Sequence, residues 1–157
     1  TDVLLATANS FTGSVLQADY NQKMAASMIM PNGLMSRQRT MTGAELKETV
    51  RAFVEGCEGG FVPFNRGSLP VVSGIAVEVK EANGSYTLTG ITRNGQPLGD
   101  GDTVTVTCLA TEKQMEALLA SDSGTSAGED AWVKNTWRDY VSGGAALAEP
   151  ENYMTLR

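Results

Sequence analysis

The sequence contains no histidine among its 157 residues. This absence removes the most common zinc ligand and the usual general base of a catalytic triad. Cys57 and Cys108 are the only cysteines, too few to indicate a redox compartment, and they could form one disulfide or stay as small buried side chains. A thiol without histidine lacks its usual activating partner. We therefore expect no catalytic residue in this chain.

Long apolar runs and an excess of positive charge are also missing. No run approaches the roughly 20 residues that cross a bilayer, so we expect no transmembrane segment. The net charge of −6 argues against a nucleic-acid duplex as the partner, because neutralising its phosphates requires clustered Lys and Arg. A small anionic ligand is compatible with this charge, because net charge does not determine the potential of a local pocket.

The length and composition indicate one domain. A chain of 157 residues, 41% of them hydrophobic, can bury one substantial core, and we expect one domain rather than two. The sequence opens with Thr1 and shows neither an initiator Met nor a signal peptide. We therefore expect residues 1–157 to form a single domain of a longer chain.

Three consecutive strands are predicted in the middle of the chain. Apolar residues alternate with polar ones around positions 75–79, 86–91 and 103–107, the period of a strand with one buried face. Asn83-Gly84 and Asn94-Gly95 between them suit tight turns, because both residue types tolerate positive φ. Loops this short cannot cross over a sheet, so we expect an antiparallel meander.

Two amphipathic helices are predicted beside this meander. Thr42 and Glu45 form a capping box before an apolar stripe that continues to Val54. Residues 131–141 carry Trp and Val at helical spacing. Further expected elements are a strand over 3–8, a helix over 21–30, a turn at Pro31-Asn32-Gly33, a strand over 34–41, a helix over 111–120 and an extended end over 149–157. The expected class is α+β, a mixed or antiparallel sheet with a central meander packed by amphipathic helices.

Arg37 and Arg39 are candidate binding residues. They lie two apart in the predicted strand over 34–41, so their side chains share one face. Two adjacent guanidinium groups could grip a phosphate or carboxylate in a bidentate manner. The alternative is a charged face that protects an edge strand from pairing with another chain.

Four segments in this order carry a resemblance to a known family. They are residues 1–9, Met41-Thr42-Gly43-Ala44-Glu45-Leu46, Val72-Ser73-Gly74-Ile75 followed by Ile91-Thr92-Arg93-Asn94-Gly95-Gln96-Pro97-Leu98, and Trp137-Arg138-Asp139-Tyr140-Val141 with the ending at Arg157. Together they resemble the C-terminal domain of the 5′-nucleotidase family, secreted or surface hydrolases of nucleotides. The likeness spans nearly the whole chain, and the order and spacing of the motifs are more specific than any one of them.

The resemblance implies the recognition half of a two-part hydrolase. In that family an N-terminal metallophosphoesterase domain holds two divalent metal ions, and the C-terminal domain presents the nucleotide to it. This chain would then hold no cofactor itself. Its partners would be the N-terminal domain of the same chain and a nucleotide or another phosphorylated small molecule. The expected setting is bacterial nucleotide breakdown in an extracellular, cell-surface or periplasmic location.

The resemblance also assigns ligand-binding positions, several of them substituted. These candidates are Asn9, Ser14, Asn32, Gly33, Leu69 and Cys108, with Arg37 and Arg39 as replacements for a lost phosphate contact. Ser14 falls near the family's phosphate-binding Arg, and Asn32 replaces the Phe of its Pro-Phe-Gly turn. Leu69 and Cys108 fall where its base-stacking Phe residues lie.

These substitutions leave two functions open. Stacking is worth roughly 1–3 kcal/mol per base, so the loss of both aromatic faces should weaken purine binding. The family's Gly-Gly-Asp-Gly-aromatic loop is missing from its expected place, and only the distantly similar Gly128-Glu129-Asp130-Ala131-Trp132 occurs later in the chain. The alternative to a recognition domain is an interaction module that keeps the fold and has lost the pocket.

Overall fold

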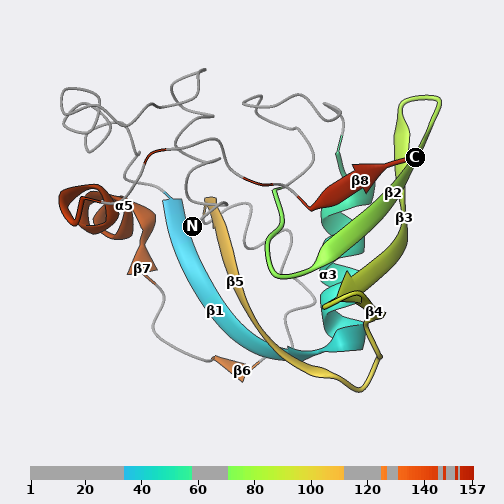
Figure 1. The fold of residues 1–157 in the computed structure, drawn as a ribbon, viewed down its shortest axis with the longest axis horizontal. Coiled ribbons are helices and arrows are strands. Elements are labelled where there is room, and N and C mark those ends of the chain that lie inside the picture. Colours follow the sequence, from blue (N-terminus) through green and yellow to red (C-terminus); the bar gives the residue numbers. More distant parts are fainter. Residues whose placement is uncertain are drawn as a thin grey trace.

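The computed structural model describes residues 34–57, 71–111, 125–126, 131–144, 147, 151 and 153–157. Over these residues the chain is α+β, as expected, with two helices among two sheets (Figure 1). The elements are β1 (Leu34–Thr42), α3 (Gly43–Glu55), β2 (Ala76–Ala82), β3 (Ser85–Arg93), β4 (Gln96–Pro97), β5 (Thr103–Thr111), β6 (Thr125–Ser126), β7 (Ala131–Trp132), α5 (Val133–Ser142) and β8 (Met154–Leu156).

Several expected elements lie outside the described residues. These are the strand over 3–8, the helix over 21–30, the turn at Pro31-Asn32-Gly33 and most of the helix over 111–120, whose first residue, Thr111, ends β5. No helix in the described part of the chain is long and apolar enough to cross a membrane.

One sheet has the strand order β4-β3-β2-β8. Strands β2 and β3 form the predicted hairpin, and β8 lies parallel to β2. Asn83 and Asn94 have φ values of 54° and 52°, which confirms both predicted Asn-Gly turns. The strand β4 follows the second turn, so β2, β3 and β4 are the central meander.

A β-bulge in this hairpin explains an irregular spacing in the sequence. Glu78 pairs with Gly90 and Val79 pairs with Leu88, so Thr89 is an extra residue in β3. The Thr89 hydroxyl donates to the carbonyl oxygen of Glu78 at 3.0 Å. The extra residue shifts the alternation by one, which places both Tyr86 and Ile91 in the core although they are five positions apart.

The prediction that residues 103–107 form the third strand of the meander is wrong. These residues form β5, which pairs antiparallel with β1 over the whole length of both strands, in a second sheet with the order β5-β1-β6 and β7 also on β1. Alternation identifies a strand but not its partner. β1 offers nine residues for pairing, whereas β4 has only two.

The helix α3 forms the main core with the first sheet. The predicted capping box is present: the Thr42 amide donates to the Glu45 carboxylate at 2.7 Å, and the Glu45 amide donates to the Thr42 hydroxyl at 3.3 Å. Leu46, Val50 and Val54 belong to one buried cluster with side chains of β2, β3, β5 and β8. In Figure 1, α5 lies across the β1–β5 ladder from α3, with its buried residues Val133, Trp137 and Val141.

A turn before β5 docks on the first turn of α3. The Gly43 amide donates to the carbonyl oxygen of Asp102 at 2.7 Å, and the Ala44 amide donates to that of Asp100 at 3.1 Å. A Cβ atom at Gly43 would lie 1.9 Å from the carbonyl oxygen of Gly99, so the close approach requires glycine. This contact joins the end of β1 to the start of β5 and thereby positions the ladder on which the candidate site lies.

Candidate functional site

The β1–β5 ladder brings Arg37, Arg39 and Cys108 together. Arg37 lies opposite Cys108, and Arg39 lies opposite Val106. Directly opposed residues of antiparallel strands project from the same face of the sheet. We call this surface the arginine face and define it by Met35, Arg37 and Arg39 of β1 with Val106 and Cys108 of β5.

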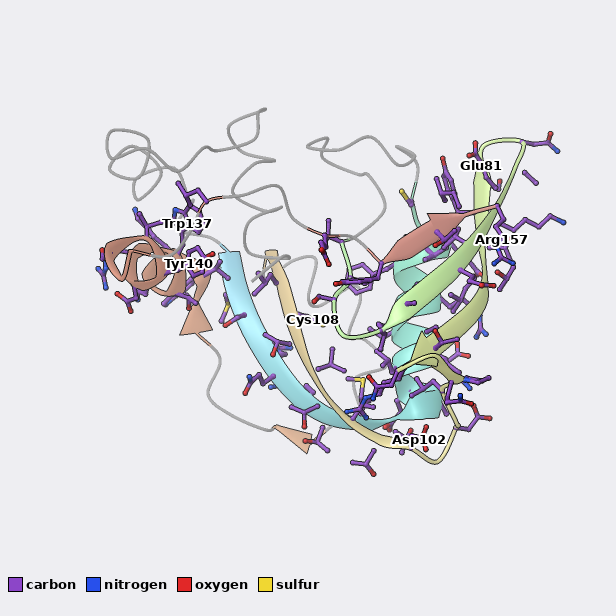
Figure 2. The ribbon with its side chains drawn as sticks, viewed as in Figure 1. Glu81, Asp102, Cys108, Trp137, Tyr140 and Arg157 are labelled. Carbon is purple, nitrogen blue, oxygen red and sulfur yellow. The ribbon has the colours of Figure 1, made fainter. Side chains whose placement is uncertain are left out.

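The burial of this face changes along the ladder. At its α3 end, Met41 and Val104 oppose each other and are only 5% and 6% exposed. All residues of the arginine face are half-buried. Figure 2 shows Cys108 partway along β5 and Asp102 at the turn that precedes this strand. The face therefore leaves the core and becomes accessible to solvent while the backbone pairing continues.

The two arginines do not protect an edge strand, so that hypothesis is wrong. β1 pairs with β5 on one side and with β6 and β7 on the other, which makes it the central strand of its sheet. The backbone of both arginines is paired with β5, and that of Arg39 is also paired with Ser126 of β6. In addition, Nη1 of Arg39 donates to the carbonyl oxygen of Gln38 at 2.7 Å. Two guanidinium groups on one face of a strand suit the bidentate binding of an oxyanion.

The opposite face of the ladder is polar and bonded to itself. Nε2 of Gln38 donates to the Thr107 hydroxyl at 3.2 Å, and the hydroxyls of Thr40 and Thr105 lie 3.3 Å apart. These short neutral side chains carry no charge to attract an anion. The candidate site is therefore confined to the arginine face.

Trp132 also lies beside the arginine face, although the sequence predicted no site role for it. It belongs to β7 and lies opposite Met35, so its side chain projects on the same side of the sheet as the arginine face. Its side chain is 49% exposed, whereas that of Trp137, five residues later, is fully buried. The only feature of the sequence that could have indicated Trp132 is the weak similarity of residues 128–132 to a Gly-Gly-Asp-Gly-aromatic loop.

The predicted disulfide alternative and the remaining predicted site residues can be compared with the structure in turn. Neither Cys57 nor Cys108 forms a disulfide. Asn9, Ser14, Asn32, Gly33 and Leu69 lie outside the described residues, so their assignments stay predictions. Within the described ranges, no group of three or more acidic or cysteine side chains is arranged to hold a metal ion.

A surface hollow of about 370 Å³ lies at the start of α3 and is less suited to an anion. It is lined by Ala44, Glu45, Lys47, Glu48, Arg51 and Asp100. Its cations already contact carboxylates: Nζ of Lys47 lies 2.6 Å from Oδ1 of Asp100, and Arg51 pairs with Glu48. The hydrogen bond and the charge of Lys47 lower the pKa of Asp100. The lining carries two cations and three carboxylates, and this excess of negative charge with its ion pairs favours a structural role.

The sequence matches no protein-family model and no curated protein. The fold matches part of sulfate thiohydrolase SoxB from Thermus thermophilus, solved with glycerol (TM-score 0.51, 14% identity, 78% of this chain and 22% of that one). It matches a protein from Staphylococcus aureus assigned as a 5′-nucleotidase, solved with α-ketoglutarate (0.57, 11%, 79% and 27%). It also matches a 5′-nucleotidase precursor from Thermus thermophilus (0.54, 14%, 82% and 26%). The chain thus shares a fold with these proteins and spans about a quarter of their length.

Proposed function

We propose that this chain is the ligand-recognition domain of a two-part hydrolase of the 5′-nucleotidase type, and that the arginine face binds the anionic group of the ligand. The shared fold supports the first part of the proposal, because the matching proteins are several times longer than this chain. We place the metallophosphoesterase domain and its two divalent metal ions elsewhere in the same chain, in an extracellular, cell-surface or periplasmic protein. No hydrolytic step is assigned to the described residues.

The register of the β1–β5 ladder is the observation that carries the binding role. It places two guanidinium groups two residues apart on one face of a central strand. Half-burial strengthens their attraction for an anion relative to bulk water, because the local dielectric constant is lower. A local positive site is also needed here, since the chain as a whole carries a net charge of −6.

The ligand class follows from the same chemistry. A guanidinium fork matches the tetrahedral oxyanion of a phosphate or sulfate ester. The names of the structural neighbours refer to nucleotides and to sulfate. Cys108 lies opposite Arg37 and offers no flat surface for stacking. We therefore propose a nucleotide or another phosphorylated small molecule whose affinity depends strongly on its oxyanion.

Thermal unfolding of the chain with AMP, adenosine, inorganic phosphate, inorganic sulfate and a UDP-sugar tests this function. Ligands that carry an oxyanion should raise the melting temperature, and adenosine should have a smaller effect. Saturation at 100 times Kd corresponds to about 2.7 kcal/mol of added stability. Arg37→Gln and Arg39→Gln should each reduce the shift.

Arg93→Gln is the matched control, because it removes one exposed positive charge from the end of β3 in the other sheet. It should keep the full shift. If no oxyanion at millimolar concentration raises the melting temperature, the chain is an interaction module that keeps only the fold. Metal-binding histidine motifs encoded upstream of Thr1 would support the two-part arrangement, and their absence would contradict it.

A further inference from the structure

We propose that the outer edge of β5 is a dimer interface, along which two copies of this chain pair antiparallel and join their four-stranded sheets into one. The strand lies at the end of its sheet, and β1 follows one of its two sides (Figure 1). The proposal is independent of the ligand role of the arginine face, because it concerns the backbone along the other side of β5.

The hydrogen-bonding pattern of the β1–β5 ladder shows which backbone groups point away from β1. The Gly43 amide donates to the carbonyl oxygen of Asp102, the next opposed pair at the α3 end of the register. Hydrogen-bonded pairs of this kind alternate with non-hydrogen-bonded pairs along an antiparallel ladder. Every second residue of β5 therefore directs its backbone amide and carbonyl outward. These residues are Thr103, Thr105, Thr107 and Leu109.

This outer edge is accessible along most of its length. Thr103, Thr105 and Thr107 are exposed, and Leu109 is half-buried. Within the described part of the chain, no turn, loop or other strand forms a hydrogen bond with the outward backbone groups of these residues. A row of such groups at a sheet edge is a template for an added strand.

β5 also lacks the features that usually protect an exposed edge. Its nine residues include no charged side chain, proline or glycine, and its register with β1 contains no bulge. The other outermost strands have two or three residues, and the part of β3 that extends past β4 contains the bulge at Thr89. Natural proteins shorten, charge or bend edge strands to prevent pairing. A long uncharged edge is expected where pairing is useful.

The sequence of β5 fits a second copy of itself. Across a two-fold axis at Val106, the outward residues pair only with one another: Thr103 opposes Leu109, and Thr105 opposes Thr107. Val106 then opposes Val106 of the second copy. Cross-strand pairs of threonine and of β-branched residues stabilise a sheet. No like charges oppose each other in this register, because β5 is uncharged.

The net charge of the chain predicts how this dimer depends on salt. Each copy carries a net charge of −6, so two copies repel each other at long range. Salt screens this repulsion, and the contacts along β5 need no charge. Association should therefore strengthen as the ionic strength rises. A basic partner attracted by the net charge would bind more weakly in salt, which distinguishes it from a second copy.

Sedimentation velocity of the chain at rising concentration tests the proposal. The mass should increase from 16.6 kDa toward twice that value, and more so in higher salt. Thr105→Lys should weaken association about tenfold or more, because a lysine on an edge strand prevents pairing. Thr87→Lys is the matched control, since it adds the same charge at an exposed threonine of β3, in the other sheet. It should keep the dimer.

Hydrogen exchange of the original chain gives a measurement that needs no variant. At low concentration the amides of Thr105 and Thr107 should exchange quickly, and at high concentration they should become protected. The amides of Val104 and Val106 point toward β1 and should be protected at both concentrations. Only pairing along the outer edge of β5 predicts this alternation.

Three results would overturn the proposal. The first is a monomer at every concentration and salt condition. The second is a dimer that persists in Thr105→Lys or is lost equally in Thr87→Lys, because the interface would then lie elsewhere. The third is protection of the Thr105 and Thr107 amides in the dilute monomer, which would show that another segment of the same chain covers the edge.

Discussion

The two ends of the β1–β5 ladder share a backbone and differ in their side chains. The antiparallel pairing continues without interruption from Thr42 opposite Thr103 to Leu34 opposite Thr111. At the α3 end the inner face presents Met41 and Val104, which belong to the core cluster. Farther along, the same face presents arginines. The ladder is therefore apolar where it meets the core cluster and charged farther along β1.

This difference separates the stability of the fold from the proposed ligand binding within one ladder. The α3 end supplies buried apolar surface and a fixed helix start, which stabilise the fold. The arginine face is half-buried, with Val106 packed against the core cluster, and it is held by strands that are anchored at the other end. A binding site on paired strands keeps its geometry better than one on a loop. We expect substitutions at the two ends to affect different measurements.

Gly43→Ala should have the largest effect, because it breaks the α3 end. The new methyl group would overlap the carbonyl of Gly99, so the turn or the helix must move. We expect the free energy of unfolding to fall by about 3 kcal/mol, measured by urea denaturation. Gly101→Ala is the control, because a Cβ there meets no atom within 4 Å, and it should change stability by less than about 0.5 kcal/mol. Equal effects of the two variants would show that the docked turn is not tightly held.

Two valines, one at each end of the comparison, should give effects of intermediate size on the free energy of unfolding. Val79 is fully buried in the core, whereas Val106 of the arginine face is half-buried. Val79→Ala removes two methyl groups and leaves a cavity, so we expect a loss of about 2 kcal/mol in urea denaturation. Val106→Ala should cost about 1 kcal/mol or less. A larger loss for Val106→Ala would mean that the arginine face is part of the core after all.

Features that depend on neighbouring residues can be predicted from this sequence. The capping box needs only Thr42 and Glu45, and each Asn-Gly turn needs only its own two residues. The shared face of Arg37 and Arg39 follows from their spacing in one strand. These three predictions are confirmed. Each of them involves only a few neighbouring positions, so the local sequence is enough to determine it.

Features that depend on distant residues cannot be predicted in the same way. The partner of β5 is β1, about seventy residues earlier in the chain, and the alternating pattern of either strand suits many partners. The pairing of Arg37 with Cys108 and the placement of Trp132 opposite Met35 follow from that register. The need for glycine at position 43 likewise arises from Gly99, in a turn that docks from another strand. The site is therefore less predictable than its individual strands.

The ion pair between Lys47 and Asp100 should give the smallest effect, at the α3 end. The hydrogen bond and the charge of Lys47 lower the pKa of Asp100 in the folded chain below its unfolded value. The pair therefore contributes stability above the unfolded pKa, and this contribution is lost as the pH falls through the folded pKa. It should be small, because the Asp100 side chain is 77% exposed and salt screens the pair.

Lys47→Met should raise the pKa of Asp100 toward its ordinary value, measured by NMR titration of the carboxyl carbon at low ionic strength. Lys80→Met is the control, because Lys80 is an exposed cation on β2 in the other sheet, and it should leave the pKa of Asp100 lowered. Lys47→Met should leave the affinity for AMP unchanged, because the pair lies at the α3 end. A change in that affinity would show that the two ends of the ladder are coupled, which contradicts the separation of stability from binding.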